Sequence, residues 1–174
     1  EENSGINKYR ILDPHVKLQQ LFPNYYIEFG NDEDIVNTEK LKTFDAIFYH
    51  VALEQVEQFA VQTQKLKDLG VKLILDIDDY WKYHPEHPYA AIALKIKLAE
   101  KSVSGIRKAS FITTTTEHFV NKIKQYNKNV HCIPNSINFN ERQFQIKEKS
   151  DEYVNIGYVA GSSHLADIKL LRGL

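Results

Sequence analysis

The sequence lacks methionine altogether and has a single cysteine, Cys132, among its 174 residues. One cysteine excludes an internal disulfide and a cysteine cage around a metal, which fits a reducing compartment. The formal net charge of -1 gives no electrostatic reason to expect nucleic acid or an anionic membrane as a partner. No apolar run approaches the ~20 residues of a membrane span. The first residues do not resemble a signal peptide.

The absence of methionine extends to position 1, and the chain stops at Leu174 inside a predicted helix. We expect these residues to be part of a longer protein, or a sequence from which some positions are missing. Hydrophobic residues at 43% and charged residues at 26% are typical of an ordinary globular protein. The length suits one domain, or one domain and a piece of another.

The chemistry of the chain is concentrated in residues 71–81 (VKLILDIDDYW). An apolar run interrupted by one lysine is typical of a strand buried on both faces of a parallel sheet. Asp76, Asp78 and Asp79 follow at once, so they are expected at the carboxyl edge of the sheet, where open α/β folds bind ligands. Period two places Asp76 and Asp78 on the same side. Any one of the three could instead cap a turn or face solvent.

Apolar strands alternate with amphipathic helices along the chain. This order predicts an α/β fold with a Rossmann-like doubly wound parallel sheet. Helices are expected over residues 8–22, restarting at Pro14, over 53–69, closed by Gly70, over 89–108, briefly after His118, and from His164. Strands are expected over residues 25–29, 45–51, 71–75, 111–116, 129–133 and 153–159.

Three further polar residues lie at predicted strand ends. His50 is near the end of one strand, and Glu117 and His118 follow another. Each could serve as a general base, and each could equally be a cap or a hydrogen-bonded loop residue.

His84, Glu86 and His87 form an HxxH-type cluster near the aspartates. A proline-rich loop lacks the helical i,i+4 geometry that makes such pairs convincing metal ligands. We therefore expect a surface loop here and no metal site.

The segment after the last predicted strand has the form of an anion site. Its residues are Gly161, Ser162, Ser163 and His164. The glycine allows a sharp turn, a serine can cap the helix, and the helix N-terminus favours a phosphate. A plain strand–turn–helix with Ser163 as N-cap has the same pattern.

Five segments in this order resemble family-4-type retaining glycosyltransferases of the GT-B fold. They are GINKYRILDP, LILDIDDYW, FITTTTEHFVNKIKQY, VHCIPNSIN and VNIGYVAGSSHLADIKLL, and the resemblance that they carry extends over most of the chain. Residues 134–138 are similar to the family's Pro-Asn-Gly-(aliphatic)-Asp run, with Ser136 in place of glycine and Asn138 in place of aspartate.

The resemblance implies an acceptor-side Rossmann-like domain over residues 1–140, a linker over 141–152, and the first strand–turn–helix of a donor-binding domain over 153–174. The implied function is transfer of a sugar from a nucleotide-sugar donor to an acceptor hydroxyl, in glycan or polysaccharide synthesis. A glycan, a lipid-linked intermediate or a protein could be the acceptor. The nucleotide-sugar is a substrate, so no cofactor is implied. A cytoplasmic location follows, with the inner face of the membrane as a second site of action.

The resemblance also implies roles for individual residues. Gly5 and Asn7 would form a glycine loop that faces the donor diphosphate, together with residues 161–164. Asp78, Asp79 and His50 would be the catalytic group of the cleft. The acceptor-side residues would be Asp76, Glu117 and His118. In such a site a helix N-terminus and basic side chains stabilise the leaving group without a metal.

The chain also departs from the family's pattern. The strand expected before the glycine loop, almost all of the donor domain and the family's paired glutamates have no counterpart. We therefore expect these 174 residues alone to bind donor poorly and to turn over negligibly.

Two other functions fit parts of the sequence. A strand followed by Asp-x-Asp also resembles the haloacid-dehalogenase-type phosphohydrolases, in which Asp76 would be the nucleophile, Asp78 the acid/base, and Mg²⁺ the required metal. Against this, the motif falls in mid-chain and Tyr80 replaces the usual small residue. The third alternative is a non-catalytic Rossmann-like binding domain.

Overall fold

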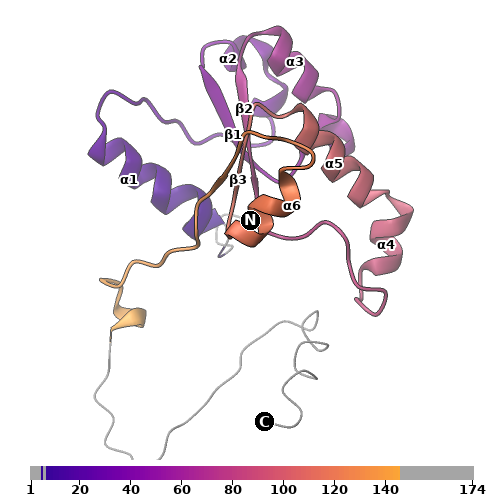
Figure 1. Cartoon of the computed structure of the whole chain (residues 1–174). Helices are drawn as coiled ribbons and strands as arrows, with labels where there is room; N and C mark the ends of the chain where they lie inside the picture. The colour runs from indigo at the N-terminus through magenta and orange to yellow at the C-terminus, as the bar shows by residue number, and fades with distance from the viewer. Residues whose placement is uncertain (1–4, 6, 146–174) are drawn as a thin grey trace, which may run out of the picture.

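The computed structural model of the chain describes residues 5 and 7–145, and these form an α/β fold around one parallel sheet (Figure 1). The sheet has four strands in the order β1-β2-β3-β4, and each neighbouring pair is parallel. The predicted fold class is therefore confirmed. The strands are β1 (Ala46–His50), β2 (Lys72–Ile77), β3 (Phe111–Thr114) and β4 (Val130–Cys132).

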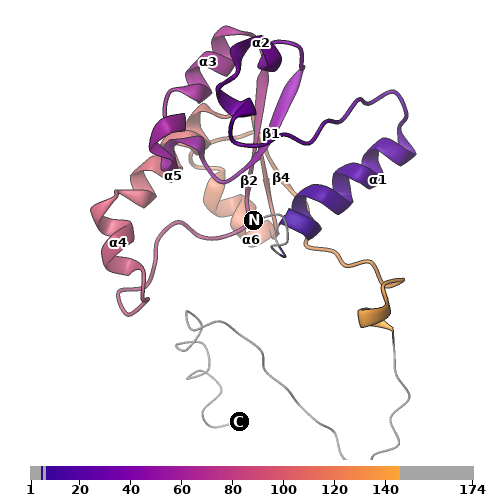
Figure 2. The same ribbon diagram turned by 180° about the vertical axis from the view of Figure 1, so that it is seen from behind.

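Helices lie on both faces of the sheet (Figures 1 and 2). Because consecutive parallel strands lie side by side, right-handed crossovers place their connecting helices on one face. This face carries α3 (Gln62–Asp68), α5 (Leu98–Lys108) and α6 (Glu117–Ile123), whereas α1 (Asp13–Leu21) lies on the other. The remaining elements are η1 (Asn7–Leu12), η2 (Asp34–Val36), α2 (Thr38–Leu41), η3 (Leu53–Gln55), η4 (Glu57–Phe59), α4 (Ala90–Lys95) and η5 (Arg142–Phe144).

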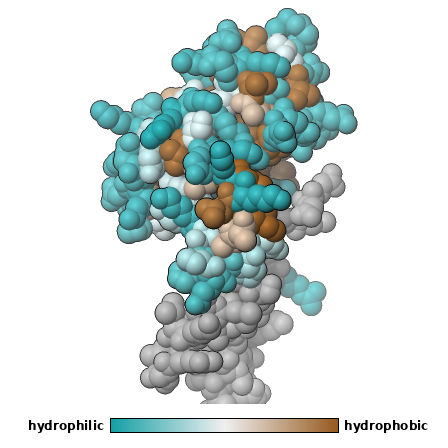
Figure 3. All heavy atoms as spheres, turned by 90° about the vertical axis from the view of Figure 1, so that its right-hand side faces the viewer, coloured by the Kyte–Doolittle hydropathy of each residue, from teal (hydrophilic) through white to brown (hydrophobic). Residues whose placement is uncertain are grey.

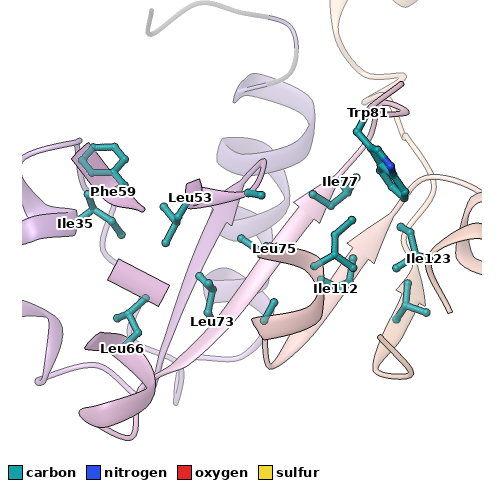
Figure 4. Close-up of a cluster of buried hydrophobic side chains, with 14 of the residues drawn as sticks. Ile35, Leu53, Phe59, Leu66, Leu73, Leu75, Ile77, Trp81, Ile112 and Ile123 are labelled. Carbon is teal, nitrogen blue, oxygen red and sulfur yellow. The ribbon is translucent and has the colours of Figure 1, made fainter. Parts of the chain in front are cut away.

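The main core fills the space between the sheet and α3, α5 and α6 (Figure 4). Alternate residues of β2, namely Leu73, Leu75 and Ile77, point into it and are at most 5% exposed. Burial of each such side chain contributes about 1.5–3 kcal/mol. On the opposite face, Phe48 packs against His15 of α1, with ring centroids 4.5 Å apart.

The strand register brings the polar strand ends together. His50 pairs with Asp76, and Asp76 in turn pairs with Thr113. All three residues therefore lie near the carboxyl edge, as expected for parallel strands whose polar ends follow apolar runs.

The strand predicted over residues 25–29 is wrong, because this segment is irregular. Tyr25 and Tyr26 are 57% and 74% exposed. An aromatic-rich run forms a strand only where a neighbouring strand completes its ladder, and none pairs with it among the described residues. The segment instead makes local aromatic contacts, such as that of Tyr26 with Phe44.

The two long predicted helices are each broken. Residues 53–69 form η3, η4 and α3, with extended backbone at Val56 between the short helices, while Gly70, at φ +74°, ends the run as predicted. Residues 89–108 form α4 and α5, separated by Lys97 at φ 55°. The break allows α5 to bury Gly105 and Ile106 on the sheet, while α4 buries none of its residues.

The side of the molecule that carries α4 shows hydrophobic side chains at its surface (Figure 3). Ile92, Leu94 and Ile96 are 57%, 82% and 42% exposed. Within the described residues, no helix is both long enough and apolar enough to pass through a bilayer.

Other boundaries follow the expectations more closely. The N-terminal helix restarts near Pro14, where η1 gives way to α1. Asn7, which the resemblance places in a glycine loop, is the first residue of η1. The HxxH segment, residues 84–87, is a loop as predicted. The expected linker begins within the described residues with η5, whereas its remainder and the expected strand–turn–helix over residues 153–174 lie outside them.

Gly105 provides a test of how closely α5 approaches the segment after β1. A Cβ at this position would lie 2.5 Å from the Ala52 Cβ and would also meet the end of the Glu54 side chain. We expect Gly105→Ala to destabilise the fold by about 1–3 kcal/mol in urea unfolding, although alanine is the better helix former.

The Ala52→Gly change should rescue part of this loss, because it removes the Cβ that the new methyl group meets. The matched control is Ser104→Ala, the neighbouring position of α5, which should change stability by less than about 0.5 kcal/mol. An equally stable Gly105→Ala variant would show that α5 does not pack this closely.

Candidate active site

The candidate site lies at the carboxyl edge of the sheet, where β1 and β2 end. His50 is the last residue of β1, Asp76 lies near the end of β2, and Asp78 directly follows that strand. The sheet geometry thus unites residues from two segments that are separated by a helical crossover. Ligands of open α/β sheets bind at this edge.

Asp76 is fully buried, and its carboxylate is held by Arg10. Arg10 Nε and Nη2 donate to Oδ2 and Oδ1, both at 2.5 Å. The Thr113 hydroxyl donates to Oδ1 at 2.6 Å. A two-pronged guanidinium–carboxylate pair of this kind is among the strongest protein hydrogen-bond arrangements, and it compensates a charge that could not otherwise remain buried.

Arg10 also connects the sheet to the segment that leaves β4. Its Nη1 donates to the Ile133 carbonyl at 3.1 Å and to Asn135 Oδ1 at 2.7 Å. The guanidinium is therefore shared by η1, β2 and residues 133–135. The pKa of Arg10 is raised. The hydrogen bond to Asp76 is the largest cause, and the negative charges of Asp76 and Asp78 add to it.

Two more contacts join η1 to the segment that follows β4. Lys8 Nζ donates to Glu141 Oε1 at 2.6 Å. The rings of Tyr9 and Phe144 lie 6.5 Å apart between centroids. Three consecutive residues of η1 thus contact the chain that follows β4.

His50 and Asp78 form a dyad beside this network. His50 Nε2 lies 2.7 Å from Asp78 Oδ1, and the two side chains are 19% and 14% exposed. An ionised carboxylate accepts hydrogen bonds only, so Nε2 carries the hydrogen and Nδ1 is the acceptor nitrogen of the neutral ring. A ring oriented in this way can accept a proton from a substrate hydroxyl.

The pKa of Asp78 lies below its usual value. Burial alone would raise this pKa, but the hydrogen bond from His50, the charge of His50 and the charge of Arg10 outweigh burial. Asp78 is therefore ionised at neutral pH, as a carboxylate that orients a histidine must be.

Val51, directly after His50, has φ 64°. The left-handed region is strained for a β-branched residue. Its N–H donates to the Asp76 carbonyl at 3.0 Å, which holds the strained backbone in place. Strain of this kind is concentrated near functional sites, where it positions a neighbouring side chain.

The other predicted residues occupy different positions. Asp79 is exposed, in the turn after Asp78. Glu117 and His118 do not end a strand, because β3 stops at Thr114 and both residues are exposed in the first turn of α6. This helix begins there because Thr116 caps it, accepting from the Phe119 N–H at 3.2 Å.

Glu117 nevertheless remains close to the edge. Burial and then the negative charge of Glu117 raise the pKa of the thiol of Cys132, the last residue of β4.

The residues predicted to face a donor phosphate are only partly described. Gly5 is exposed, and a Cβ there would meet nothing within 4 Å. Asn7 is half-buried at the start of η1. Gly161, Ser162, Ser163 and His164 lie outside the described residues.

Within residues 5 and 7–145, no group of three or more histidine, cysteine, aspartate or glutamate side chains is arranged to hold a metal ion. A phosphohydrolase of the haloacid-dehalogenase type would need Asp76 as an accessible nucleophile beside Mg²⁺. Asp76 has no exposed surface, and hydrogen bonds from Arg10 and Thr113 occupy its carboxylate oxygens. This geometry disfavours the phosphohydrolase alternative.

Comparison with known proteins gave no match to a family model, to a curated protein or to a solved structure. We therefore infer function from the geometry of the edge and from the motifs in the sequence.

Sequence reasoning missed Arg10. The available signal was indirect: an aspartate inside a buried strand requires a cationic or hydrogen-bonding partner. The motif GINKYRILDP contains that cation, but the partners are 66 residues apart in the chain. Nothing local to either residue indicates the pairing.

We expect Arg10→Ala to destabilise the fold by about 3–5 kcal/mol, because it leaves the Asp76 charge buried without its partner. Urea unfolding measures this loss. Combining Arg10→Ala with Asp76→Asn should recover part of it, giving a clear coupling energy in a double-mutant cycle.

The exposed pair of Lys42 and Glu39, whose side chains are 50% and 80% exposed, is the matched control. Lys42→Ala should cost less than about 1 kcal/mol. Equal losses for Arg10→Ala and Lys42→Ala would contradict the buried pair.

The lowered pKa of Asp78 predicts how stability depends on pH. A carboxylate with a depressed folded-state pKa stabilises the fold above its unfolded pKa of about 3.9, and this contribution is lost as the pH falls through the folded value. The wild type should therefore exceed Asp78→Asn by its full margin at about pH 5, and the margin should shrink below about pH 4. Urea midpoints between about pH 3 and 7 test this. A margin that grows as the pH falls from about 5 to 3 would contradict the pairing of Asp78 with His50.

Proposed function

We propose that this chain forms the acceptor-side half of a retaining glycosyltransferase, which moves a sugar from a nucleotide-sugar donor to an acceptor hydroxyl. The observation that carries the proposal is the His50–Asp78 dyad at the carboxyl edge of the parallel sheet. The five sequence segments that resemble family-4-type transferases support it independently. A histidine held by a carboxylate at this edge can orient or deprotonate an acceptor hydroxyl.

The dyad acts on the acceptor. The Asp78 carboxylate holds the imidazole in one tautomer, so that Nδ1 faces the acceptor hydroxyl and orients or deprotonates it. The ionised state of Asp78 favours a positive charge on the ring as the proton arrives. The strained Val51 after His50 fixes the direction in which the ring leaves β1.

Asp76 has a positioning role in this mechanism. Its carboxylate is sealed by Arg10 and Thr113, so it does not contact substrate. It keeps η1 on the sheet and thereby forms one wall of the edge. The other acceptor-side residues, Glu117 and His118, are exposed and therefore accessible to a bound acceptor, as is Asp79, which was predicted as part of the catalytic group.

Stabilisation of the nucleoside diphosphate is assigned to the other half of the enzyme. By resemblance, Gly5 and Asn7 face the donor phosphates from the acceptor-side domain, and residues 161–164 face them from the start of the donor domain. The leaving group then departs without a metal. The acceptor is a glycan, a lipid-linked intermediate or a protein, and the reaction belongs to cytoplasmic glycan or polysaccharide synthesis.

The activity test uses a longer protein that contains these residues, with a panel of nucleotide-sugars and acceptor mixtures. Release of nucleoside diphosphate and NMR of the new anomeric centre should show transfer with retained configuration. Magnesium-dependent hydrolysis of p-nitrophenyl phosphate would instead support the phosphohydrolase. Thermal stabilisation by nucleotide-sugars without turnover would support a binding domain. Efficient transfer by the 174 residues alone would contradict the division into two halves.

In the active protein we expect Asp78→Asn to lower kcat by about a hundredfold or more while donor KM stays nearly unchanged. The reason is that asparagine no longer holds the imidazole in the required tautomer or compensates its charge. Steady-state kinetics with donor and acceptor varied separately measure this split.

Asp79→Asn is the matched control, since it removes the same charge one residue further along and Asp79 is exposed. Its kcat should fall by less than about tenfold. Equal effects of the two substitutions would remove the dyad from the mechanism.

A further inference from the structure

A pocket of about 330 Å³ opens at the amino edge of the sheet, opposite the candidate active site. Its lining includes Lys72 and Phe111, the first residues of β2 and β3, with Lys67 and Lys108 from the last turns of α3 and α5. The six residues of β2 separate the two edges by roughly 20 Å. The pocket is therefore distinct from the site assigned to sugar transfer.

The pocket has an excess of positive charge. Lys67, Lys72 and Lys108 line it from three different elements. Lys108 Nζ lies 3.3 Å from Glu54 Oε1, whereas no ion pair is formed by Lys67 or Lys72 within the part of the chain that the structure describes. Lys67 and Lys72 therefore carry uncompensated charge beside the cavity, and an anion would relieve the repulsion between them.

Helix C-termini explain part of this charge but not all of it. Lys67 and Lys108 lie in the last turns of α3 and α5, where cations interact favourably with the helix dipole. Lys72 begins a strand and has no such reason to lie here.

The neutral polar groups of the lining also offer donors without acceptors. Thr63 is 3% exposed, and its hydroxyl has no hydrogen-bond partner in the described part of the chain. The Ser110 hydroxyl accepts from the Leu73 N–H at 3.2 Å, which leaves its own proton to donate. A buried hydroxyl without a partner is costly, and an anionic oxygen would satisfy it.

The lining is apolar between these polar groups. Val71 and Leu73 are 4% and 2% exposed and form part of the wall, and the 40% exposed Phe111 offers a ring at the opening. The volume lies at the lower end of small-molecule sites and exceeds what a single phosphate ion fills. From these features we infer that the amino-edge pocket binds a small phosphate monoester, with its phosphate on the lysines and its organic part against Phe111.

Isothermal titration of the full 174-residue chain with phenyl phosphate, inorganic phosphate and phenol tests this site. Phenyl phosphate should bind saturably and about tenfold or more tighter than inorganic phosphate, because its ring buries apolar surface. Phenol, which lacks the charge, should not bind measurably. Amide NMR shifts should be concentrated at residues 70–73 and 110–111.

The double variant Lys67→Gln/Lys72→Gln should weaken phenyl phosphate binding by about tenfold or more, since it removes two charges from the phosphate. Lys17→Gln, an exposed lysine of α1 on the other face of the sheet, should leave the affinity unchanged. Thr63→Val should weaken binding a few-fold without lowering the free energy of unfolding, because the wild-type hydroxyl has no partner to lose.

Absence of saturable binding by phenyl phosphate would overturn the assignment. So would equal affinity in the wild type and the Lys67→Gln/Lys72→Gln variant, or NMR shifts confined to the carboxyl edge. Each of these outcomes is independent of whether the protein transfers sugar.

Discussion

The pair between Arg10 and Asp76 holds the described fold together at the carboxyl edge of the sheet. A fully buried carboxylate in the middle of a sheet would cost several kcal/mol if it stood alone. The guanidinium satisfies it from a helix that precedes the whole sheet in sequence. The position of η1, the closure of the sheet's second face and the path of the chain after β4 all follow from this contact.

The same pair gives Asp76 an environment that differs from that of Asp78. Asp76 points towards Arg10 and Thr113 and is sealed, while Asp78, two residues later and beyond the end of β2, reaches His50 and remains partly accessible. The end of β2 therefore carries one fully buried carboxylate, Asp76, and one that is partly accessible, Asp78. The charge of Arg10 also helps to keep Asp78 ionised.

Sequence patterns predicted the sheet and one side of the site because these depend on short-range rules. Apolar runs and parallel order placed His50 and the aspartates at a common edge, and the register confirms that His50 pairs with Asp76. The strand over residues 25–29 failed because strand formation needs a partner that local sequence does not encode. The left-handed break at Lys97 was likewise invisible, since helix-forming residues continue on both sides of it. Arg10 could not be assigned to Asp76, because their pairing is decided by three-dimensional packing.

The contacts between η1 and residues 133–144 have a mechanical consequence. Lys8, Tyr9 and Arg10 each contact the stretch between residues 133 and 144. The two ends of the described chain are therefore held together by an ion pair, a ring contact and a shared guanidinium. Any force that acts on the chain beyond residue 144 is therefore shared between the backbone of β4 and the contacts of Lys8, Tyr9 and Arg10, of which only Arg10 is bonded to Asp76.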